Sequence, residues 1–462
     1  MKVIAKRMFG SQMPARLLPP INLLVQDELR RKLARRQRAD HYYFVDVVGT
    51  CNLRCPSCPV GNWDSPMPKG IMELPHFQQI VQTIRGQHDA GQRLFVDLYN
   101  WGEATLHPRL ADIIKDVKQH GMGCGISTNM NVFPAMREVV KAAPDYIRIS
   151  LSGFYDETYR RTHARGSAFA VKSNMYRLRE LLDRHANNDT VVQVGYHIYR
   201  SNFPRDFLKM RELCDELGFL FDPVIASFMP AEKAVQNIDG QIAPGDRDIH
   251  DILVVPMRRI AEIYREEGIT VDDCHYRKSR TSINFDGSVS LCCAVYDRDK
   301  IIADDFLAVP PEELRKRKYS HDFCGSCMSR NLHLLYTAVP ASGIEKEAER
   351  VLGPLYSEFL EENRKIGSSE YVIFDNQFLS KDEAYRRGMD ALRAGGKKLD
   401  EAEAYFNALV SYTPDFGEGF FQAARIAERK GAMARARELM AEASRLAPDH
   451  ELYRKEFLRL TS

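Results

Sequence analysis

Three cysteines placed directly after an apolar run constrain this chain more than any other feature. Tyr42–Val48 reads as a buried strand, and only two residues separate it from Cys51. Three residues then separate Cys51 from Cys55, and two separate Cys55 from Cys58. A loop with this spacing turns its sulfurs toward one point. Thiolates select iron–sulfur clusters, zinc or cuprous copper, and three thiolates on a four-iron cubane leave one iron without a protein ligand.

With this CxxxCxxC spacing the chain resembles the radical S-adenosylmethionine (SAM) enzymes. The resemblance implies a [4Fe-4S] cluster on Cys51, Cys55 and Cys58, whose open iron binds the amino and carboxylate groups of SAM. Reduction would then cleave SAM to methionine and a 5′-deoxyadenosyl radical, which takes a hydrogen atom from the substrate. A zinc knuckle is the alternative. Zinc usually takes four ligands, and no fourth cysteine or nearby pair of histidines follows.

Length and composition indicate a multidomain cytoplasmic protein. A chain of 462 residues suggests about three domains, and an apolar content of 44% suffices for packed cores. The formal net charge of +2 creates no field that attracts nucleic acid or an anionic membrane. No apolar run approaches the length of a membrane span, and Ile21–Val25 is too short for a secretory signal. Its cysteines are therefore not expected to form disulfides.

Strand-like and helix-like segments alternate from residue 42 to about residue 230. The apolar runs are Tyr42–Val48, Leu94–Tyr99, Gly123–Ser127, Tyr146–Leu151, Val191–Tyr199 and Phe219–Ile225. Such alternation predicts an α/β fold of βαβ units around a parallel sheet. Six strands match the partial (β/α)6 barrel that the resemblance implies. In such barrels the chemistry gathers at the carboxyl ends of the strands.

Polar segments follow the second and third predicted strands. Trp101-Gly102-Glu103 resembles the GGE motif of the family, with tryptophan in place of the first glycine. The resemblance implies that this motif binds the SAM amino group, through a charge-assisted hydrogen bond from the ammonium to the acid. Ser127-Thr128-Asn129 is similar to the segment that contacts the SAM ribose, since its hydroxyls and amide suit a diol. Alone, such a triplet commonly caps a helix.

The fourth strand is followed by two serines and three arginines. Ser150 and Ser152 occupy a place where similar enzymes use Ser or Asp. A downstream arginine of the family pairs with the SAM carboxylate, which suits the bidentate geometry of guanidinium. Arg160, Arg161 and Arg165 are the candidates, and we select Arg165 while the choice stays open.

The fifth strand predicts a polar barrel interior. Alternation along the strand places Gln193, His197 and Tyr199 on one face. These side chains, with Asp97 and Asp222, would suit a hydroxylated or charged substrate. The alternative is that the histidine is a satisfied core residue and the acids are buried partners of arginines.

A second set of cysteines follows the predicted barrel. Cys274 and Cys292 flank a hairpin over residues 283–291, and Cys324 and Cys327 come later. The arrangement resembles the first half of a SPASM/twitch auxiliary domain. Because no cysteine follows Cys327, the resemblance implies the shorter twitch form, with one auxiliary [4Fe-4S] cluster on these four thiolates. A four-cysteine zinc ribbon is the alternative.

Cys293 is a candidate catalytic residue. Adjacent strand residues face opposite ways, so Cys292 and Cys293 do not easily serve one cluster. A thiol that faces the substrate would return a hydrogen atom to a carbon radical, as in radical SAM epimerases. A small core residue is the alternative. Cys124 and Cys214 read as core residues.

The remaining segments complete a five-part organisation. The sequence predicts a basic helical leader over 1–40, a radical SAM barrel over 41–265, an auxiliary domain over 266–335, a connector over 336–378 and a helical domain over 379–462. Pro414 and Pro448 stand 34 residues apart, the period of tetratricopeptide (TPR) repeats. Two such repeats do not easily bury their core alone, so the tail is expected to dock on the barrel or to dimerise. A protein-binding role and a packed structural cap are equal alternatives for it.

These features predict a radical SAM oxidoreductase acting on a C–H bond of a polar small molecule, such as a sugar or aminocyclitol. Dehydrogenation and epimerisation are the leading outcomes, and modification of a peptide is an alternative. A flavodoxin or ferredoxin would supply electrons. A non-catalytic TPR adaptor with an Fe–S scaffold is the hypothesis from another class.

Overall fold

The computed structural model describes most of the chain. The described residues are 21–37, 39–62, 67–271, 273–339, 341–360, 371–374, 377–413 and 416–461. Contacts between residues divide the chain into two compact units. Residues 28–357 form one unit, and residues 358–462 with the segment up to Asp27 form the other. Within the described residues, no helix combines the length and apolar character needed to cross a membrane.

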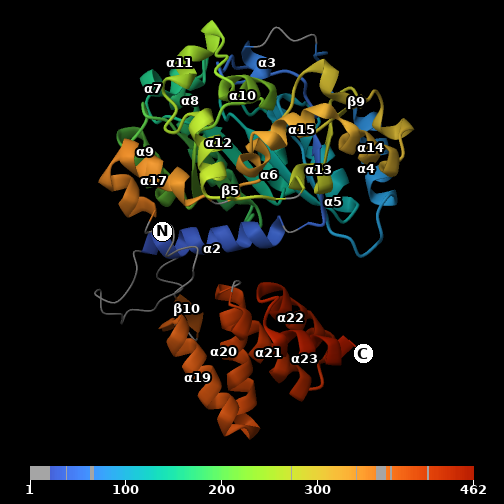
Figure 1. The fold of residues 1–462 in the computed structure, drawn as a ribbon, viewed down its shortest axis with the longest axis vertical. Helices are drawn as coiled ribbons and strands as arrows, with labels where there is room; N and C mark the ends of the chain where they lie inside the picture. The colour runs from blue at the N-terminus through green and yellow to red at the C-terminus, as the bar shows by residue number, and fades with distance from the viewer. Residues whose placement is uncertain are drawn as a thin grey trace. The chain divides into compact units, whose positions relative to one another are not determined.

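A parallel sheet organises the larger unit (Figure 1). Its strands are β1 (His41–Val45), β2 (Leu94–Asp97), β3 (Gly123–Thr128), β4 (Tyr146–Leu151), β5 (Val191–Ile198) and β6 (Leu220–Ile225). Each strand pairs in parallel with the next along the chain, so the spatial order follows the sequence order. The α/β fold with a parallel sheet is confirmed.

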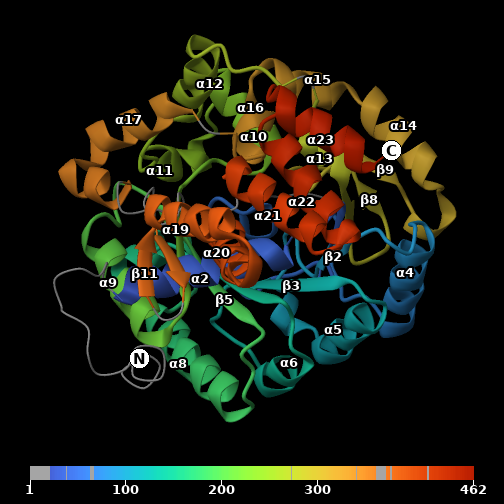
Figure 2. The same cartoon turned by 90° about the horizontal axis from the view of Figure 1, so that it is seen from below.

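Amphipathic helices cover the outer face of this sheet. They are α4 (Leu74–Gly86), α5 (Leu110–Gln119), α6 (Met136–Ala142), α8 (Ala168–Arg184) and α9 (Arg205–Leu217), which follow one another around the strands in Figure 2. Strand alternation separates the two faces. On β4, Ile147 and Ile149 are fully buried, whereas Arg148 and Ser150 stay partly exposed on the other face. The polar residues therefore share the interior side of the curved sheet.

The predicted hairpin over residues 283–291 forms and extends the same sheet. β7 (Arg280–Ile283) pairs antiparallel with β8 (Val289–Ser290), and Gly287 adopts a positive φ of 86° in the turn. β7 also pairs in parallel with β1, so Arg280 lies beside Tyr42. β9 (Ile301–Ala303) completes the nine-stranded order. The hairpin that leads to the second cysteine set is thus a direct continuation of the barrel wall.

Short helices carry most of the remaining auxiliary segment. They are α13 (His275–Ser279), α14 (Pro311–Ser320) and α15 (Asp322–Ser329). Cys274 is the N-cap of α13, and α15 contains Cys324 and Cys327. The segment 336–378, which the sequence predicts as a connector, includes α17 (Ser342–Leu352).

The N-terminal helix α2 (Ile21–Arg36) closes the end of the barrel at which the strands begin. Leu33 is buried in a cluster with Phe95, Tyr146, Val191 and Leu220, and Leu29 packs against it. These residues come from β2, β4, β5 and β6. Leu29 and Leu33, on the apolar side of the predicted leader helix, therefore cover the end of the barrel at which the strands begin. The opposite end, where the strands finish, is left for a site.

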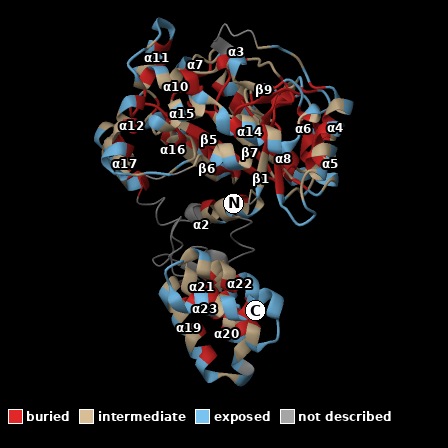
Figure 3. Ribbon diagram, turned by 45° about the vertical axis from the view of Figure 1, so that its right-hand side comes forward, coloured by how far each residue is buried: buried red, intermediate tan, exposed pale blue. Residues whose placement is uncertain are grey.

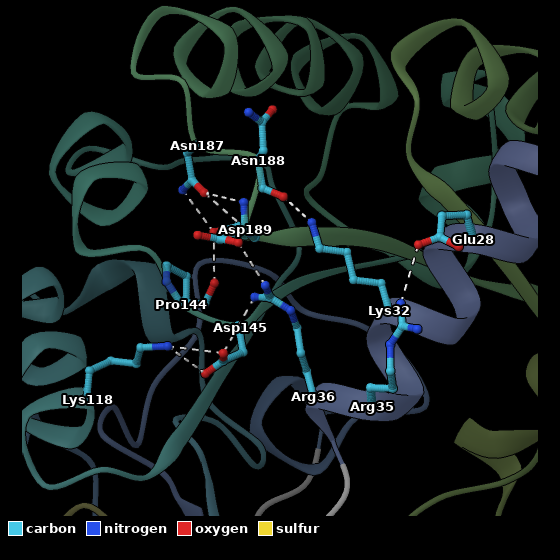
Figure 4. A network of polar contacts seen from close by, with 11 residues as sticks. Glu28, Lys32, Arg35, Arg36, Lys118, Pro144, Asp145, Asn187, Asn188 and Asp189 are labelled. Carbon is cyan, nitrogen blue, oxygen red and sulfur yellow. Dashed lines mark hydrogen bonds and ion pairs between the residues drawn. The ribbon is translucent and has the colours of Figure 1, made fainter. Parts of the chain in front are cut away.

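Basic residues fasten the same helix to the barrel rim (Figure 4). Arg36 pairs with Asp189 at 3.0 Å and with Asp145 at 3.6 Å. Lys118 reaches Asp145 at 3.0 Å, and Lys32 donates to the Asn188 carbonyl. The basic face of the predicted leader helix thus makes polar contacts with loops at the amino ends of β4 and β5.

The smaller unit is helical after a short hairpin of β10 (Tyr371–Phe374) and β11 (Gln377–Ser380). Its helices are α19 (Lys381–Ala394), α20 (Leu399–Tyr412), α21 (Gly417–Arg429), α22 (Met433–Leu446) and α23 (Glu451–Thr461). Small and aromatic residues form its core, including Ala402, Phe406 and Ala424, while the outer faces are exposed (Figure 3). The helical C-terminal region is confirmed. Its TPR assignment stays a prediction, and Pro414 lies outside the described residues.

We predict that Leu33→Ala destabilises the larger unit by about 2–4 kcal/mol, because it removes a buried side chain from the plug of the barrel. Urea unfolding under anaerobic conditions measures the loss. Phe169→Ala is the matched control, since Phe169 is 76% exposed on α8 and its truncation should cost less than about 0.5 kcal/mol. Equal losses in the two variants would contradict the assigned role of α2.

Candidate functional site

The three cysteines of the first set lie in the loop after β1. Leu53 donates its backbone N–H to the Cys51 sulfur over 3.4 Å, and the Cys58 N–H donates to the Cys55 carbonyl over 3.1 Å. Burial raises the pKa of Cys51 to about 11, and Glu103 and Cys58 add to the increase. Burial also raises the pKa of Cys55, and the neighbouring Cys58 and Cys51 add to the increase. The structure therefore brings the three thiols together.

Asp46, at the end of β1, holds the loop that follows β2. Its buried carboxylate accepts backbone N–H groups of Asn100 at 3.3 Å, Trp101 at 3.1 Å and Gly102 at 3.2 Å. Burial raises the pKa of Asp46 to about 6, although these bonds favour its charged form. At Gly102, a Cβ atom would lie 1.5 Å from the Val48 carbonyl oxygen. Only glycine permits this approach of the two loops.

Glu103 and Asn129 connect three loops at the carboxyl ends of the strands. The Glu103 carboxylate is buried and accepts the Asn129 N–H over 2.8 Å and the Thr105 hydroxyl over 2.5 Å. The Asn129 amide donates to the Cys51 sulfur over 3.5 Å and to Asn52 over 2.9 Å. Burial raises the pKa of Glu103. Two of the residues predicted to contact SAM, Glu103 and Asn129, thus join one network beside the first cysteine set.

The serines after β3 and β4 differ in their surroundings. Ser127 and Ser150 are partly exposed on their strands. Thr128 accepts the Met130 N–H over 2.9 Å. Ser152 is buried, where its hydroxyl bonds to Thr162 and, over 3.2 Å, to His163. Ser152 therefore supports the loop after β4 from inside.

The three candidate arginines are distinguished by their neighbours. Arg160 pairs with Asp156 at 3.0 Å, and Arg161 is exposed on the same helix, α7 (Asp156–Thr162). Arg165 adopts a positive φ of 70°, which is uncommon for a non-glycine residue. The preceding carbonyl, that of Ala164, accepts the Arg54 N–H over 3.0 Å. Arg165 is thereby fixed next to the cysteine loop, while its two rivals lie on α7.

The second cysteine set also comes together. The thiol of Cys292 is near those of Cys324 and Cys327, and Cys274 is near Cys324 and Cys327. Burial raises the pKa of Cys327 to about 12. The buried ammonium of Lys318 lies beside this set.

Cys293 faces a different environment from its neighbour. Its thiol lies near the Arg280 guanidinium and near Asp97, on the interior face of the sheet. Cys292 instead lies near Cys324 and Cys327. Burial raises the pKa of Cys293 to about 11, although Arg280 opposes the increase. The two cysteines were expected to be adjacent residues of a strand, and this is wrong, because β8 ends at Ser290 and both residues follow it in irregular structure and a turn. Their surroundings nevertheless differ.

Two side chains connect Cys293 to the loop after β2. The Trp101 indole N–H donates to the Val295 carbonyl over 3.0 Å. With its amide nitrogen turned toward Cys293, Asn100 donates to the Cys293 carbonyl over 3.1 Å. The tryptophan that replaces the first glycine of the motif thus joins the barrel loop to the auxiliary segment.

The interior of the barrel is polar, as the fifth strand predicts. Tyr146 donates to the Asp97 carboxylate and lies 2.8 Å from the Tyr99 hydroxyl. Gln193 donates to Asp222 over 2.5 Å. Burial raises the pKa of Asp97 to about 6.

Sequence reasoning missed Asp46, Arg148 and Arg280. Arg148 is on the inward face of β4, and alternation along the fourth apolar run was a signal that could have found it. Asp46 interrupts an apolar run at a strand end. Arg280 had no such signal, because its place depends on the pairing of β7 with β1.

Comparison with known families identifies the domain. Residues 45–209 match the model of the radical SAM superfamily. The chain therefore contains a radical SAM domain, and the superfamily that this domain defines uses a [4Fe-4S] cluster and SAM. Among curated proteins, 112 residues are 28% identical to the tungsten-containing aldehyde ferredoxin oxidoreductase cofactor-modifying protein of Pyrococcus furiosus. That match covers 24% of this chain and 30% of the relative, less than a third of its length.

Three solved structures with partial similarity to this chain all have TM-scores below 0.5. Native anSMEcpe with bound AdoMet has a TM-score of 0.41 and 13% identity, and the match covers 62% of this chain and 82% of that one. Streptococcus suis SuiB bound to precursor peptide SuiA has a TM-score of 0.42 and 10% identity, covering 71% and 77%. BtrN in complex with AdoMet and 2-DOIA has a TM-score of 0.35 and 11% identity, covering 63% and 87%.

We predict that Gly102→Ala destabilises the larger unit by about 2 kcal/mol or more, because the new methyl group would overlap the Val48 carbonyl. Gly86→Ala is the control, since no atom lies within 4 Å of a Cβ at Gly86 near the end of α4. Urea unfolding midpoints compare the two. If both substitutions were tolerated equally, the close approach of the two loops would not matter for stability.

Proposed function

We propose that this radical SAM enzyme abstracts a hydrogen atom from a polar small molecule inside the barrel, and that Cys293 returns a hydrogen atom to the substrate carbon. The observation that carries this proposal is the position of Cys293. Its thiol faces the polar interior beside Arg280 and Asp97, away from the cysteines that surround Cys292. The expected reaction type is therefore epimerisation.

The first cysteine set suits the cluster that the family uses. Cys51, Cys55 and Cys58 are buried enough to raise the pKa of Cys51 and Cys55, and a bound cation would hold such thiols as thiolates. Backbone and amide N–H groups point at the Cys51 sulfur, as is common around cluster ligands. When bound, the cluster and SAM supply the 5′-deoxyadenosyl radical.

The remaining residues of the network would orient SAM. We assign the amino group of SAM to Trp101-Gly102-Glu103 and its ribose to Ser127-Thr128-Asn129, with Ser150 and Ser152 supporting the adjacent loop. The SAM carboxylate would pair with Arg165, because the Ala164 carbonyl ties this arginine to the cysteine loop. A carboxylate can accept about four hydrogen bonds, so Glu103 keeps acceptor capacity beyond Asn129 and Thr105.

The second cysteine set suits an auxiliary [4Fe-4S] cluster on Cys274, Cys292, Cys324 and Cys327. Four thiolates would suit either an iron–sulfur cluster or zinc. We assign the cluster, because these cysteines follow a radical SAM domain in the same chain.

Hydrogen return by Cys293 balances simply. The sulfur–hydrogen bond of the thiol breaks, a carbon–hydrogen bond of the substrate forms, and a thiyl radical remains on Cys293. One electron and one proton restore the thiol, and a one-electron donor such as a flavodoxin or ferredoxin would supply the electron. The Arg280 guanidinium lies beside this thiol.

Dehydrogenation is the second candidate function. It is favoured by the direct sequence neighbourhood of Cys292 and Cys293, which would put an auxiliary electron acceptor beside the substrate radical. The substrate would then lose two hydrogens in total. A peptide substrate remains an alternative for the same chemistry, and a protein contact or homodimer through the C-terminal helices is a separate proposal.

We predict that Cys293→Ala abolishes hydrogen return, lowering it at least about 100-fold, while 5′-deoxyadenosine release persists. The reconstituted enzyme is incubated anaerobically in D2O with SAM, dithionite and a small-molecule cell extract. Mass spectrometry then follows the metabolites. Because a thiol exchanges with solvent, the wild-type enzyme should add one deuterium to one metabolite without another change in its formula.

Cys214→Ala is the control, since Cys214 is a fully buried core residue of α9. A metabolite that loses two hydrogens in both the wild type and Cys293→Ala would end the donor proposal and favour dehydrogenation. A protein that releases no 5′-deoxyadenosine would end the radical proposal itself.

We also predict about eight irons per reconstituted chain and about four in Cys327→Ala, because that variant loses one ligand of the auxiliary cluster. Iron, sulfide and zinc analysis measures the content. Cys124→Ala, at a buried position of β3, should keep the wild-type content. About four irons with one zinc in the wild type would instead establish the zinc ribbon.

A further inference from the structure

We propose that Arg148 and Arg280 form a binding site for an anionic oxygen group of the substrate, a carboxylate or a phosphate, in the interior of the barrel. This inference rests on the proposed function, because it describes how the substrate is held beside Cys293. Both arginines project from strands of the central sheet, β4 and β7, onto its interior face. Both remain partly exposed there.

Arg148 owes its position to a glycine on the next strand. A Cβ at Gly195 would lie 2.6 Å from Arg148 Nε and 2.8 Å from one of its terminal nitrogens. Gly195 follows the partner of Arg148 along β5 by two residues, so its missing side chain leaves room for the guanidinium to lie along that strand. The positive charge of the guanidinium also favours a lower pKa for His197 and for Asp97, which places Arg148 within the polar interior.

Arg280 is held by aromatic rings rather than by a carboxylate. Its guanidinium carbon lies 4.0 Å from the ring centre of Tyr276 and 5.4 Å from that of Phe44. Its Nε atom is buried and has no hydrogen-bond partner within the described residues. The hydroxyl of Ser282, two residues along the same face of β7, is likewise buried and unpartnered there. Donors on β7 are thus left for a ligand.

The charges inside the barrel leave an excess that an anion would balance. The Asp97 carboxylate attracts both arginines electrostatically, but within the described residues no ion pair joins it to either one. Asp222 has Gln193 as a hydrogen-bond donor and lies near Arg30 of α2. Guanidinium groups removed from water are costly unless they are paired, and their planar donors match carboxylate or phosphate in a bidentate way.

The site would also fix which carbon reacts. Arg280 lies near the Cys293 thiol, so an anion bound at Arg280 would lie next to the proposed hydrogen donor. The anionic group would anchor one end of the substrate. The reacting carbon would then lie a few bonds away, within reach of the thiol.

Anion binding to the reconstituted enzyme tests this inference. Inorganic phosphate and acetate are titrated separately with saturating SAM and no reductant, so that the SAM site is filled and no radical chemistry takes place. Ligand-observed NMR measures the dissociation constants. Arg148→Gln and Arg280→Gln should each raise the constant of the bound anion about tenfold, as expected for loss of charge-assisted hydrogen bonds. Arg148→Lys should lose less, because it keeps the charge.

Arg137→Gln, an exposed position on α6, is the control and should bind as the wild type does. Binding of phosphate alone would assign a phosphate ester, and binding of acetate alone would assign a carboxylate. If Arg148→Gln does not fold, Gly195→Ala gives the second reading, since its methyl group would displace the guanidinium. Wild-type enzyme that binds neither anion, or variants that bind like the wild type, would overturn the inference without touching the radical chemistry.

Discussion

A single buried carboxylate, that of Asp46, determines how the functional loops are placed. It accepts three consecutive backbone N–H groups, from residues 100 to 102, and so joins the end of β1 to the loop after β2. That loop presents Glu103 to Asn129, and Asn129 in turn reaches the Cys51 sulfur. Buried N–H groups without partners are costly, so the loop depends on this acceptor. The order of the site follows from one interaction at a strand end.

The architecture of the larger unit could be predicted because its signals are local. Apolar runs of strand length alternate with amphipathic segments, and each of the six predicted runs from Tyr42 to Ile225 overlaps an observed strand. The hairpin around Gly287 could also be predicted, from the residues of its turn. What the sequence did not predict is that β7 pairs with β1 in parallel. That pairing joins segments more than 200 residues apart, and no periodicity records it.

The same distinction applies to the candidate site. The CxxxCxxC spacing is local and could be read from the sequence. The different surroundings of Cys292 and Cys293 could not, because both residues follow the end of β8 and strand alternation does not apply to them. The sequence could not distinguish Arg165 from the other two candidate arginines, because the difference lies in a hydrogen bond from the Arg54 backbone N–H to the Ala164 carbonyl. The place of Arg280 in the site could not be predicted from the sequence for the same reason. Its role comes from Tyr276, Phe44 and Cys293, which only the folded chain assembles.

Trp101 departs from the family motif, and its side chain makes contacts that a glycine could not make. In the family motif that this segment resembles, a glycine stands here. The backbone N–H of Trp101 is still held by Asp46, so the turn survives the larger residue. The indole extends to the Val295 carbonyl, and its ring meets Tyr296 edge-on at 6.0 Å. The tryptophan thereby packs the auxiliary segment against the loop after β2, and it helps to fix Cys293, two residues before Val295, over the barrel interior.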